Sequence, residues 1–294
     1  MFQQVKKYLS LIKFSHTIFA MPFAFVGFGL GLRHQLDMSV EAGLSTWIWK
    51  GMWVIACMIF ARSAAMAFNR YLDRSIDALN PRTATREIPA GLIAPQRALM
   101  FTIANAILFA GSAFLINRLC FYLSPIALLV ILGYSYTKRF TALCHLVLGA
   151  GLSLSVMGAY LAVTSEFALL PLMVSLTVFT WVAGFDIIYS LQDESFDRSQ
   201  QLHSIPAWLG SRRALVVSSV LHFLTISFLF FAGIWGDFGF WYWAGTLAFC
   251  ALLIYQHALV SPEDLSRVDL AFMTTNGIGS VVFSIFMIVE LMVA

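Results

Sequence analysis

Two short polar segments of this chain carry oxygen-bearing side chains at intervals of four residues. The sets share this spacing and are Asn69, Asp73 and Asp77 in the first segment, and Tyr189, Asp193 and Asp197 in the second. Four residues on a helix rotate a side chain by only about 40° beyond a full turn, so each set is expected to line one helix face. Carboxylate and amide oxygens suit Mg²⁺, which proteins hold through one or two carboxylates together with waters and substrate phosphates. The spacing therefore predicts divalent cations that hold a diphosphate.

The predicted metal ligands come from both segments and are Asn69, Asp73, Asp77, Asp193 and Asp197. Asp73 and Asp193, at the centre of each segment, are the predicted catalytic carboxylates. For one segment alone, the simpler interpretation is a solvated helix end whose acids pair with neighbouring arginines. Two copies with matched spacing favour the metal site.

Asp186 is the most informative single residue, because it follows the apolar run 181–185 near the end of a membrane-length stretch. An ionised carboxylate at the centre of a membrane helix costs roughly 2.5–3.5 kcal/mol, and less near the interface. Asp186 also shares nearly one helical face with Asp193. We expect Asp186 to be a metal ligand or a carboxylate that orients one, and we count it among the substrate-binding residues. The alternative is a pair with Arg62 or another buried cation.

A diphosphate also requires cationic partners, and arginine forks match the geometry of phosphate oxygens. The basic residues near the two segments are Arg70, Arg74, Arg82, Arg86, Lys138 and Arg139. Lys138 and Arg139, which leave an apolar stretch through residues 134–137, are the first choice for contacting phosphate. Arg62 is expected to bind the carboxylate of a second substrate that accepts the group released from the diphosphate, or else to neutralise Asp186.

The elements that must position these residues are membrane helices. The chain is 60% hydrophobic and only 11% charged, against about 25% charged in soluble proteins. Nine apolar stretches reach or approach bilayer length, at residues 14–32, 46–68, 98–116, 121–137, 143–163, 168–189, 214–234, 240–260 and 271–293. The sequence predicts an all-α integral membrane protein, with nine transmembrane helices around a central cavity in a single domain over residues 1–294.

The cationic residues indicate orientation in the membrane. With nine spans and a cytoplasmic N-terminus, most of the 18 Lys and Arg residues flank spans on the cytoplasmic side. This places both acidic segments and the Lys138–Arg139 pair at the cytoplasmic face of the membrane. The basic residues border a lipid bilayer and an acidic site, so no nucleic-acid partner is expected, and no obligate protein partner is inferred.

Other polar residues do not suggest a second chemistry. The four cysteines are scattered without metal-type spacing and are interpreted as small core residues. His145, His222 and His257 lack zinc-like spacing and are predicted to be isolated in or near spans, whereas His16 is expected at the cytoplasmic start of the first span.

A faint internal repeat relates the two acidic segments. Each is followed by an Ile-Pro-Ala sequence, at residues 88–90 and 205–207, and then by a glycine, Gly91 or Gly210. Proline ends a helix and glycine permits a chain reversal. Because duplicated halves of membrane proteins often bind a ligand at their interface, the repeat predicts one shared site.

Together these residues resemble the UbiA-type membrane prenyltransferases, most of all their bacterial 4-hydroxybenzoate-polyprenyltransferase-like branch. The resemblance covers nearly the whole chain and rests on residues 13–17, 62–83, 134–141 and 184–198. Many members have Asn-Asp where this chain has Asn69-Arg70, a departure that removes one acid.

The resemblance implies Mg²⁺-dependent transfer of a polyprenyl group from its diphosphate to the ring of an aromatic acid, in ubiquinone or menaquinone biosynthesis. It assigns Lys138, with Tyr134 beside it, as the family's basic partner of the diphosphate. It assigns the binding of metal and diphosphate to Asn69, Asp73, Asp77, Asp193 and Asp197. Tyr189 is expected to lie against the allylic chain. The acceptor is 4-hydroxybenzoate or a similar acid; the alternative is 1,4-dihydroxy-6-naphthoate, from the futalosine route to menaquinone.

A cation-coupled transporter is the alternative from another functional class. Transport favours acids at mid-membrane depth, whereas most of these acids follow the ends of apolar stretches. Their position favours the enzyme.

Overall fold

The computed structural model describes residues 2–12, 19–39 and 43–293, and all regular structure within these ranges is helical. This confirms the prediction of an all-α protein. Residues 13–17, which carry part of the family resemblance and include His16, lie outside the described ranges.

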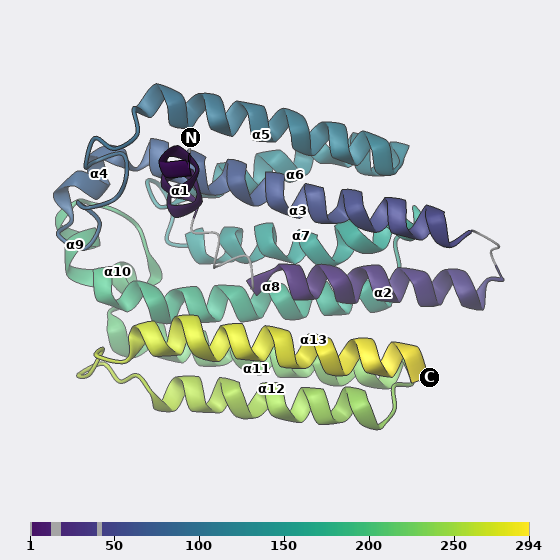
Figure 1. Cartoon of the computed structure of the whole chain (residues 1–294). Coiled ribbons are helices and arrows are strands. Elements are labelled where there is room, and N and C mark those ends of the chain that lie inside the picture. The colour runs from purple at the N-terminus through teal and green to yellow at the C-terminus, as the bar shows by residue number, and fades with distance from the viewer. Residues whose placement is uncertain (1, 13–18, 40–42, 294) are drawn as a thin grey trace. The chain divides into compact units, whose positions relative to one another are not determined.

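The chain divides into two compact units, Met1–Thr17 with Met52–Tyr136, and Ile18–Gly51 with Thr137–Ala294. The long and short helices of unit 1 are α1 (Phe2–Leu11), most of α3 (Leu44–Leu72), α4 (Arg74–Leu79), α5 (Pro95–Ile116) and α6 (Arg118–Thr137). Those of unit 2 are α2 (Met21–Asp37), α7 (Cys144–Thr164), α8 (Leu169–Ser190), the 3₁₀ turn η2 (Leu191–Asp193), α9 (Glu194–Ser199), α10 (Ile205–Leu209), α11 (Ser211–Trp235), α12 (Phe240–Ala258), the π-helical turn η3 (Leu270–Thr275) and α13 (Asn276–Val293) (Figure 1).

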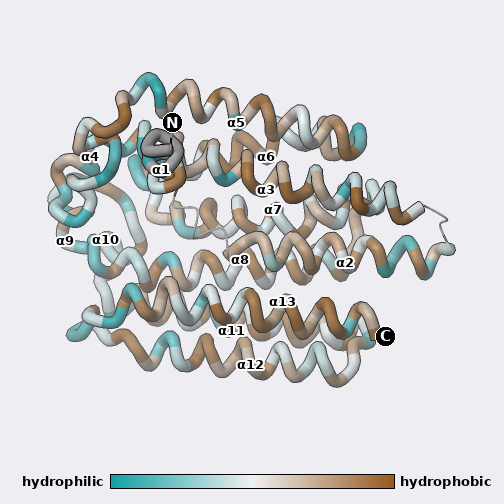
Figure 2. The backbone as a smooth tube through the Cα atoms, viewed as in Figure 1, coloured by the Kyte–Doolittle hydropathy of each residue, from teal (hydrophilic) through white to brown (hydrophobic). Residues whose placement is uncertain are grey.

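Seven helices are long and apolar enough to cross a membrane, among the residues that the structure describes. Five of them are the single helices α3, α5, α6, α7 and α11. The other two join neighbouring elements: Leu169–Ser199 covers α8, η2 and α9, and Leu270–Val293 covers η3 and α13. The two remaining predicted spans, 14–32 and 240–260, overlap α2 and α12, which are helices of 17 and 19 residues outside that set. Figure 2 shows polar residues in the short helices α4 and α9, and apolar residues along the long helices. The protein is therefore a multi-pass membrane protein.

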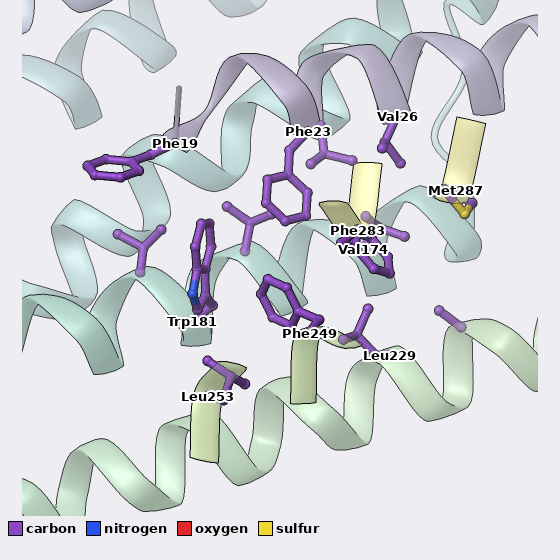
Figure 3. Packing of buried hydrophobic residues seen from close by; sticks show 14 of the residues in the cluster. Phe19, Phe23, Val26, Val174, Trp181, Leu229, Phe249, Leu253, Phe283 and Met287 are labelled. Carbon is purple, nitrogen blue, oxygen red and sulfur yellow. The ribbon is translucent and has the colours of Figure 1, made fainter. Parts of the chain in front are cut away.

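The core of unit 2 lies where α8 packs against α7 and α11, and where α13 packs against α2 and α12. Trp181 of α8 is fully buried, with its ring centroid 5.3 Å from that of Phe23 and 5.5 Å from that of Phe249 (Figure 3). Phe283 of α13 stacks on Phe23 at 5.9 Å. Since lipid tails are as apolar as these side chains, close packing rather than water exclusion holds such helices together.

Small residues bring the helices of unit 2 into close contact. A Cβ atom at Gly27 of α2 would overlap the backbone carbonyl of Val156 in α7, and one at Gly149 of α7 would overlap the carbonyl of Phe179 in α8. Both positions accept only glycine at these separations, as is common where membrane helices cross.

Unit 1 is built around α3. Phe68 of α3 contacts Tyr136 of α6 with ring centroids 5.8 Å apart, and Cys57 Sγ lies 3.9 Å from the carbonyl oxygen of Phe109 in α5. The buried residues Leu11, Ala67, Ile88, Ile93 and Ala98 join α1, α3, the loop after α4 and α5 in a small apolar cluster. This cluster anchors the loop that follows the first acidic segment to α1, α3 and α5.

Several hydroxyl groups inside the helices donate hydrogen bonds to backbone carbonyls of the same helix, as an apolar surrounding favours. Pro125 lacks an N–H and leaves the carbonyl of Phe121 without its helical partner, and Ser124 Oγ donates a hydrogen bond to that oxygen at 2.8 Å. Thr177 and Ser175 donate to backbone carbonyls four residues earlier.

Candidate active site

The first acidic segment, Asn69–Asp77, spans a helix break. Helix α3 ends at Leu72, Asp73 has φ −86° and ψ 2°, and α4 begins at Arg74. The amides of Asp73 and Asp77 still bond the carbonyls four residues earlier, at 2.9 and 2.7 Å. The four-residue spacing is therefore kept through the break, and Asn69 Nδ2 donates a hydrogen bond to Asp73 Oδ2 at 3.2 Å.

Only one of the two carboxylate oxygens of Asp77 has a hydrogen-bond partner among the residues that the structure describes. Arg86 Nη1 lies 2.7 Å from Asp77 Oδ1 in a largely buried ion pair. Asp77 Oδ2 is buried and accepts no hydrogen bond from the described part of the chain. A buried carboxylate oxygen without a donor is costly unless something binds it, so this atom suits a cation or water ligand.

The two arginines of the first segment have different surroundings. Arg70 is only 5% exposed and lies within electrostatic range of Asp77, Glu87, Arg86 and Tyr134. Arg74 is exposed and folds back onto Tyr71, with Nη1 donating to the Tyr71 carbonyl at 2.6 Å and the guanidinium 4.6 Å from the ring centroid. Of these two candidate substrate-binding arginines, the structure places Arg70 within electrostatic range of Asp77 and Glu87, and Arg74 on the surface.

The second acidic segment, Tyr189–Asp197, has a similar construction. Helix α8 ends at Ser190, the 3₁₀ turn η2 covers Leu191–Asp193, and α9 begins at Glu194. Asp73 and Asp193, with φ and ψ of −86° and 2° and of −101° and 2°, each directly precede a six-residue helix. Further along, Gly91 and Gly210 both have positive φ, 72° and 81°. The internal repeat seen in the sequence is present in the local backbone.

The partly buried Asp197 is surrounded by charged groups of its own unit. Asp193, Lys138 and His145 all lie within electrostatic range of its carboxylate. The carbonyl of Lys138 also accepts a hydrogen bond from His203 N at 2.7 Å, which ties the turn after α6 to the loop after α9. The structure therefore brings together Lys138 and the second acidic segment, as predicted for a basic partner. Arg139, beside Lys138, is partly buried.

Tyr189, at the start of the second segment, packs against the π-helical turn. Its ring stacks on that of Phe272 with centroids 4.1 Å apart and an interplanar angle of 27°. Phe272 also contacts Phe19 and Phe185 edge-on, at 5.4 and 5.6 Å. An aromatic cluster thus borders the segment; π-turns often mark functional sites, but no sequence signal pointed to Phe272.

The prediction that the histidines are isolated is wrong. His145 Nδ1 lies 2.7 Å from Asp186 Oδ2, and His222 Nδ1 lies 2.9 Å from His257 Nε2. The partners come from different helices, so their spacing in the sequence carries no signal. Asp186 has His145 rather than an arginine as its hydrogen-bonded neighbour within unit 2.

In unit 1, the remaining predicted residues lie near the first segment. Tyr134 of α6 is within electrostatic range of both Arg62 and Arg70 of α3. Arg86, which sequence reasoning counted only among nearby cations, is the direct partner of Asp77.

Each acidic segment, taken by itself, fits Mg²⁺ as part of a coordination shell. Within the described ranges, no group of three or more His, Cys, Asp or Glu side chains is assembled closely enough to hold a metal ion. Each unit supplies two carboxylates of the acidic segments, all hard oxygen donors, and Asp77 Oδ2 still needs a partner. Mg²⁺ normally completes such a shell with waters and phosphate oxygens, so these residues would hold it together with a phosphorylated ligand.

Comparisons with known proteins agree with this chemistry. The UbiA prenyltransferase family model matches residues 20–278. A 4-hydroxybenzoate octaprenyltransferase from Nitrosomonas europaea is 31% identical over 226 residues, 77% of this chain and 77% of that protein. The protein of the same name from Aeromonas salmonicida is 29% identical over 80% of this chain and 81% of its own length.

Solved structures share the fold. A UbiA homolog from Aeropyrum pernix superposes with a TM-score of 0.81 at 32% identity, covering 94% of this chain and 98% of that protein. A UbiA homolog from Archaeoglobus fulgidus, solved with DMAPP and Mg²⁺ bound, superposes with a TM-score of 0.75 at 20% identity, covering 98% of this chain and 100% of that protein.

Proposed function

The chain belongs to the UbiA prenyltransferase family and is an enzyme of that family; from this premise we propose that it transfers a polyprenyl group from polyprenyl diphosphate to the ring of an aromatic acid of the 4-hydroxybenzoate type. Relatives that bear the name 4-hydroxybenzoate octaprenyltransferase support this acceptor class. The end product would be a ubiquinone or menaquinone precursor.

The observation that carries the proposal is the matched construction of the two acidic segments. Asp73 and Asp193 each directly precede a six-residue helix that follows a long apolar helix, with the 3₁₀ turn η2 intervening in the second segment. We propose that α2 and α12 complete nine spans in one domain with a central cavity. The most polar parts of the chain would then lie at the cytoplasmic face of a bacterial inner membrane.

In this arrangement Asn69, Asp73, Asp77, Asp193 and Asp197 would hold Mg²⁺, which neutralises the diphosphate as a leaving group. Lys138, beside Asp197, would bind a phosphate oxygen, with Arg139 next to it. Both residues therefore act on the charge that develops as the bond to the diphosphate breaks.

Aromatic residues would act on the prenyl group. The faces of Tyr134 and Tyr189 would stabilise positive charge on the allylic carbon after the C1–O bond breaks and the diphosphate leaves with the electron pair. The acceptor ring carbon then bonds to C1, and its proton passes to a carboxylate of the acidic segments or to released diphosphate. Arg62 would bind the acceptor carboxylate, and Asp186, oriented by His145, would border the second segment.

Membranes that contain the protein test the proposal directly. With Mg²⁺, a labelled polyprenyl diphosphate and 4-hydroxybenzoate, we expect a lipid-soluble prenylated acid. Asp73→Ala and Asp193→Ala should each abolish turnover without loss of membrane insertion, whereas Asp264→Ala, in an exposed loop, should keep it. Full activity in both segment variants would disprove the metal assignment.

The acceptor needs a separate competition. 4-Hydroxybenzoate and 1,4-dihydroxy-6-naphthoate, supplied together at equal concentration, give prenylated products of different mass. A dominant benzoate product supports the proposed acceptor, and a dominant naphthoate product would replace it. If neither acid is prenylated by an enzyme that still binds diphosphate, the acceptor class itself is wrong.

A further inference from the structure

The first acidic segment contains a buried cation directly after its first oxygen donor. Arg70 follows Asn69, is 5% exposed, and its Nε makes no hydrogen bond to any residue that the structure describes. Its electrostatic neighbours include Asp77 and Glu87 on the acidic side and Arg86 on the basic side. A buried guanidinium N–H without an acceptor is costly, so this group is suited to an anion that arrives with the substrate.

The charge of the first segment is partly offset within the protein. Its two carboxylates, Asp73 and Asp77, are 2% and 4% exposed. Arg86 forms an ion pair with Asp77, and Arg70 lies within electrostatic range of Asp77 and of Glu87. Arg86 already occupies Asp77 Oδ1 at 2.7 Å. A cluster of this composition attracts a divalent cation much less than an uncompensated pair of carboxylates does.

The second acidic segment has no cation at the equivalent position. The residue after Tyr189 is Ser190, whose Oγ donates a hydrogen bond to the Ile187 carbonyl at 2.9 Å. The cation next to Asp197 is Lys138, which comes from the turn after α6. The two segments therefore share a backbone but differ in charge at one matched site.

We propose that Arg70 takes the place of a divalent cation in the first segment and binds the diphosphate oxygens directly. The first segment then holds at most one Mg²⁺, through Asn69, Asp73 and Asp77 Oδ2, and the chain needs one divalent cation fewer than it would with an acid at residue 70. The inference rests on the proposed function, because it assigns how the same diphosphate is held. Arginine suits this role because its planar fork donates two parallel hydrogen bonds to phosphate.

Counting bound Mn²⁺ by electron paramagnetic resonance tests the inference without turnover. Purified protein is titrated with Mn²⁺ in the presence of saturating inorganic pyrophosphate. We expect Arg70→Asp to bind one more Mn²⁺ per chain than the wild type. Arg97→Asp, an exposed position in the first turn of α5 that makes the same change in net charge, should leave the count unchanged. Equal counts in the wild type and Arg70→Asp would overturn the inference.

Pyrophosphate affinity gives a second measurement, which also serves if Arg70→Asp does not fold. Arg70→Gln keeps the length and polarity of the side chain without its charge. With Mg²⁺ removed by chelation, we expect Arg70→Gln to bind pyrophosphate about tenfold more weakly than the wild type, since a hydrogen bond to a charged group is lost. Equal affinity of the two proteins would contradict a direct contact.

These outcomes separate the inference from the proposed function. A wild type that binds no pyrophosphate even at saturating Mg²⁺ would overturn both, because there would be no diphosphate site. A wild type that binds pyrophosphate only with Mg²⁺, with the same Mn²⁺ count as Arg70→Asp, would keep the proposed function and remove the role of Arg70.

Discussion

His145 and Asp186 form a hydrogen-bonded pair between α7 and α8, with His145 Nδ1 2.7 Å from Asp186 Oδ2. The amide of Ile205 donates to His145 Nε2 at 3.3 Å, at the start of α10. Because a backbone N–H can only donate, Nε2 must accept, and the ring proton that reaches Asp186 belongs to Nδ1. One side chain therefore joins the helix that leads into the second acidic segment to the Ile-Pro-Ala turn that follows it.

Replacing His145 tests this link. His145→Ala leaves Asp186 Oδ2 and the Ile205 N–H without their partners, and we expect a loss of about 1–3 kcal/mol in unfolding free energy. His145→Asn, whose amide can replace Nδ1, should recover part of the loss. Thermal unfolding in detergent measures both, with the exposed His203→Ala as the control. An unchanged melting temperature in His145→Ala would show that the pair adds nothing.

The contact between α2 and α7 predicts an asymmetric effect of glycine substitutions. Gly27→Ala forces a methyl group into the carbonyl of Val156, and we expect destabilisation of about 1–3 kcal/mol from overpacking. Gly158→Ala, on the same helix as Val156, meets no atom within 4 Å and should be neutral or slightly stabilising. The melting temperatures of the two variants measure the difference, and equal shifts would refute the close approach.

A buried carboxylate closes the N-terminus of α12. Glu290 of α13, 3% exposed, accepts hydrogen bonds from Gly239 N at 2.5 Å and Tyr242 N at 3.2 Å. These amides lie at the N-terminus of α12, where a negative charge also interacts favourably with the positive end of the helix dipole. We expect Glu290→Ala to cost about 1–3 kcal/mol and Glu290→Gln to cost less. Chemical unfolding monitored by tryptophan fluorescence compares them with the exposed Met292→Ala; a Glu290→Ala curve that matches this control would argue against the cap.

The stacking of Phe272 on Tyr189 predicts a change in product distribution. We treat Phe272 as a positioning residue, since it acts through the tyrosine. Phe272→Leu loses an aromatic contact worth about 0.5–1.5 kcal/mol, and should raise the yield of prenyl alcohol, formed when water captures the allylic carbon, relative to the prenylated acid. Phe272→Tyr should keep the wild-type ratio.

Product analysis by chromatography gives the alcohol-to-acid ratio, and kinetics should show a fall in kcat with little change in KM for the diphosphate. Phe240→Leu, at an exposed position, controls for loss of an aromatic ring elsewhere. If Phe272→Leu lowers only stability, the residue has a packing role alone.

The helices themselves could be predicted because bilayer-length apolar stretches leave few alternatives. Predicted spans such as 98–116 and 143–163 coincide closely with α5, Pro95–Ile116, and α7, Cys144–Thr164. The acidic segments were also recognisable, because a four-residue spacing is a local property of helical backbone. The helix breaks at Asp73 and at Asp193 did not follow from spacing. The first keeps the four-residue hydrogen-bond period, whereas the second includes the 3₁₀ turn η2.

Contacts between side chains distant in sequence could not be predicted in this way. Nothing in the sequence around His145 indicates Asp186 as its partner, and nothing around Tyr189 indicates Phe272. Arg70 and Arg74 are similar by position, yet one is buried among charges and the other lies on the surface over Tyr71. Arg70 lies in the last turn of α3, whereas Arg74 is the first residue of α4, after the break at Asp73.

The amino-acid sequence by itself determined that this is a helical membrane protein with two acidic segments of one pattern, because apolar length and helical period are local properties that each stretch carries alone. Only the tertiary structure decided which charges meet: Arg86 with Asp77, Lys138 near Asp197, and His145 with Asp186. The physical reason is that these pairs form through helix packing, where close contacts such as that of Gly27 with Val156 set the register between elements.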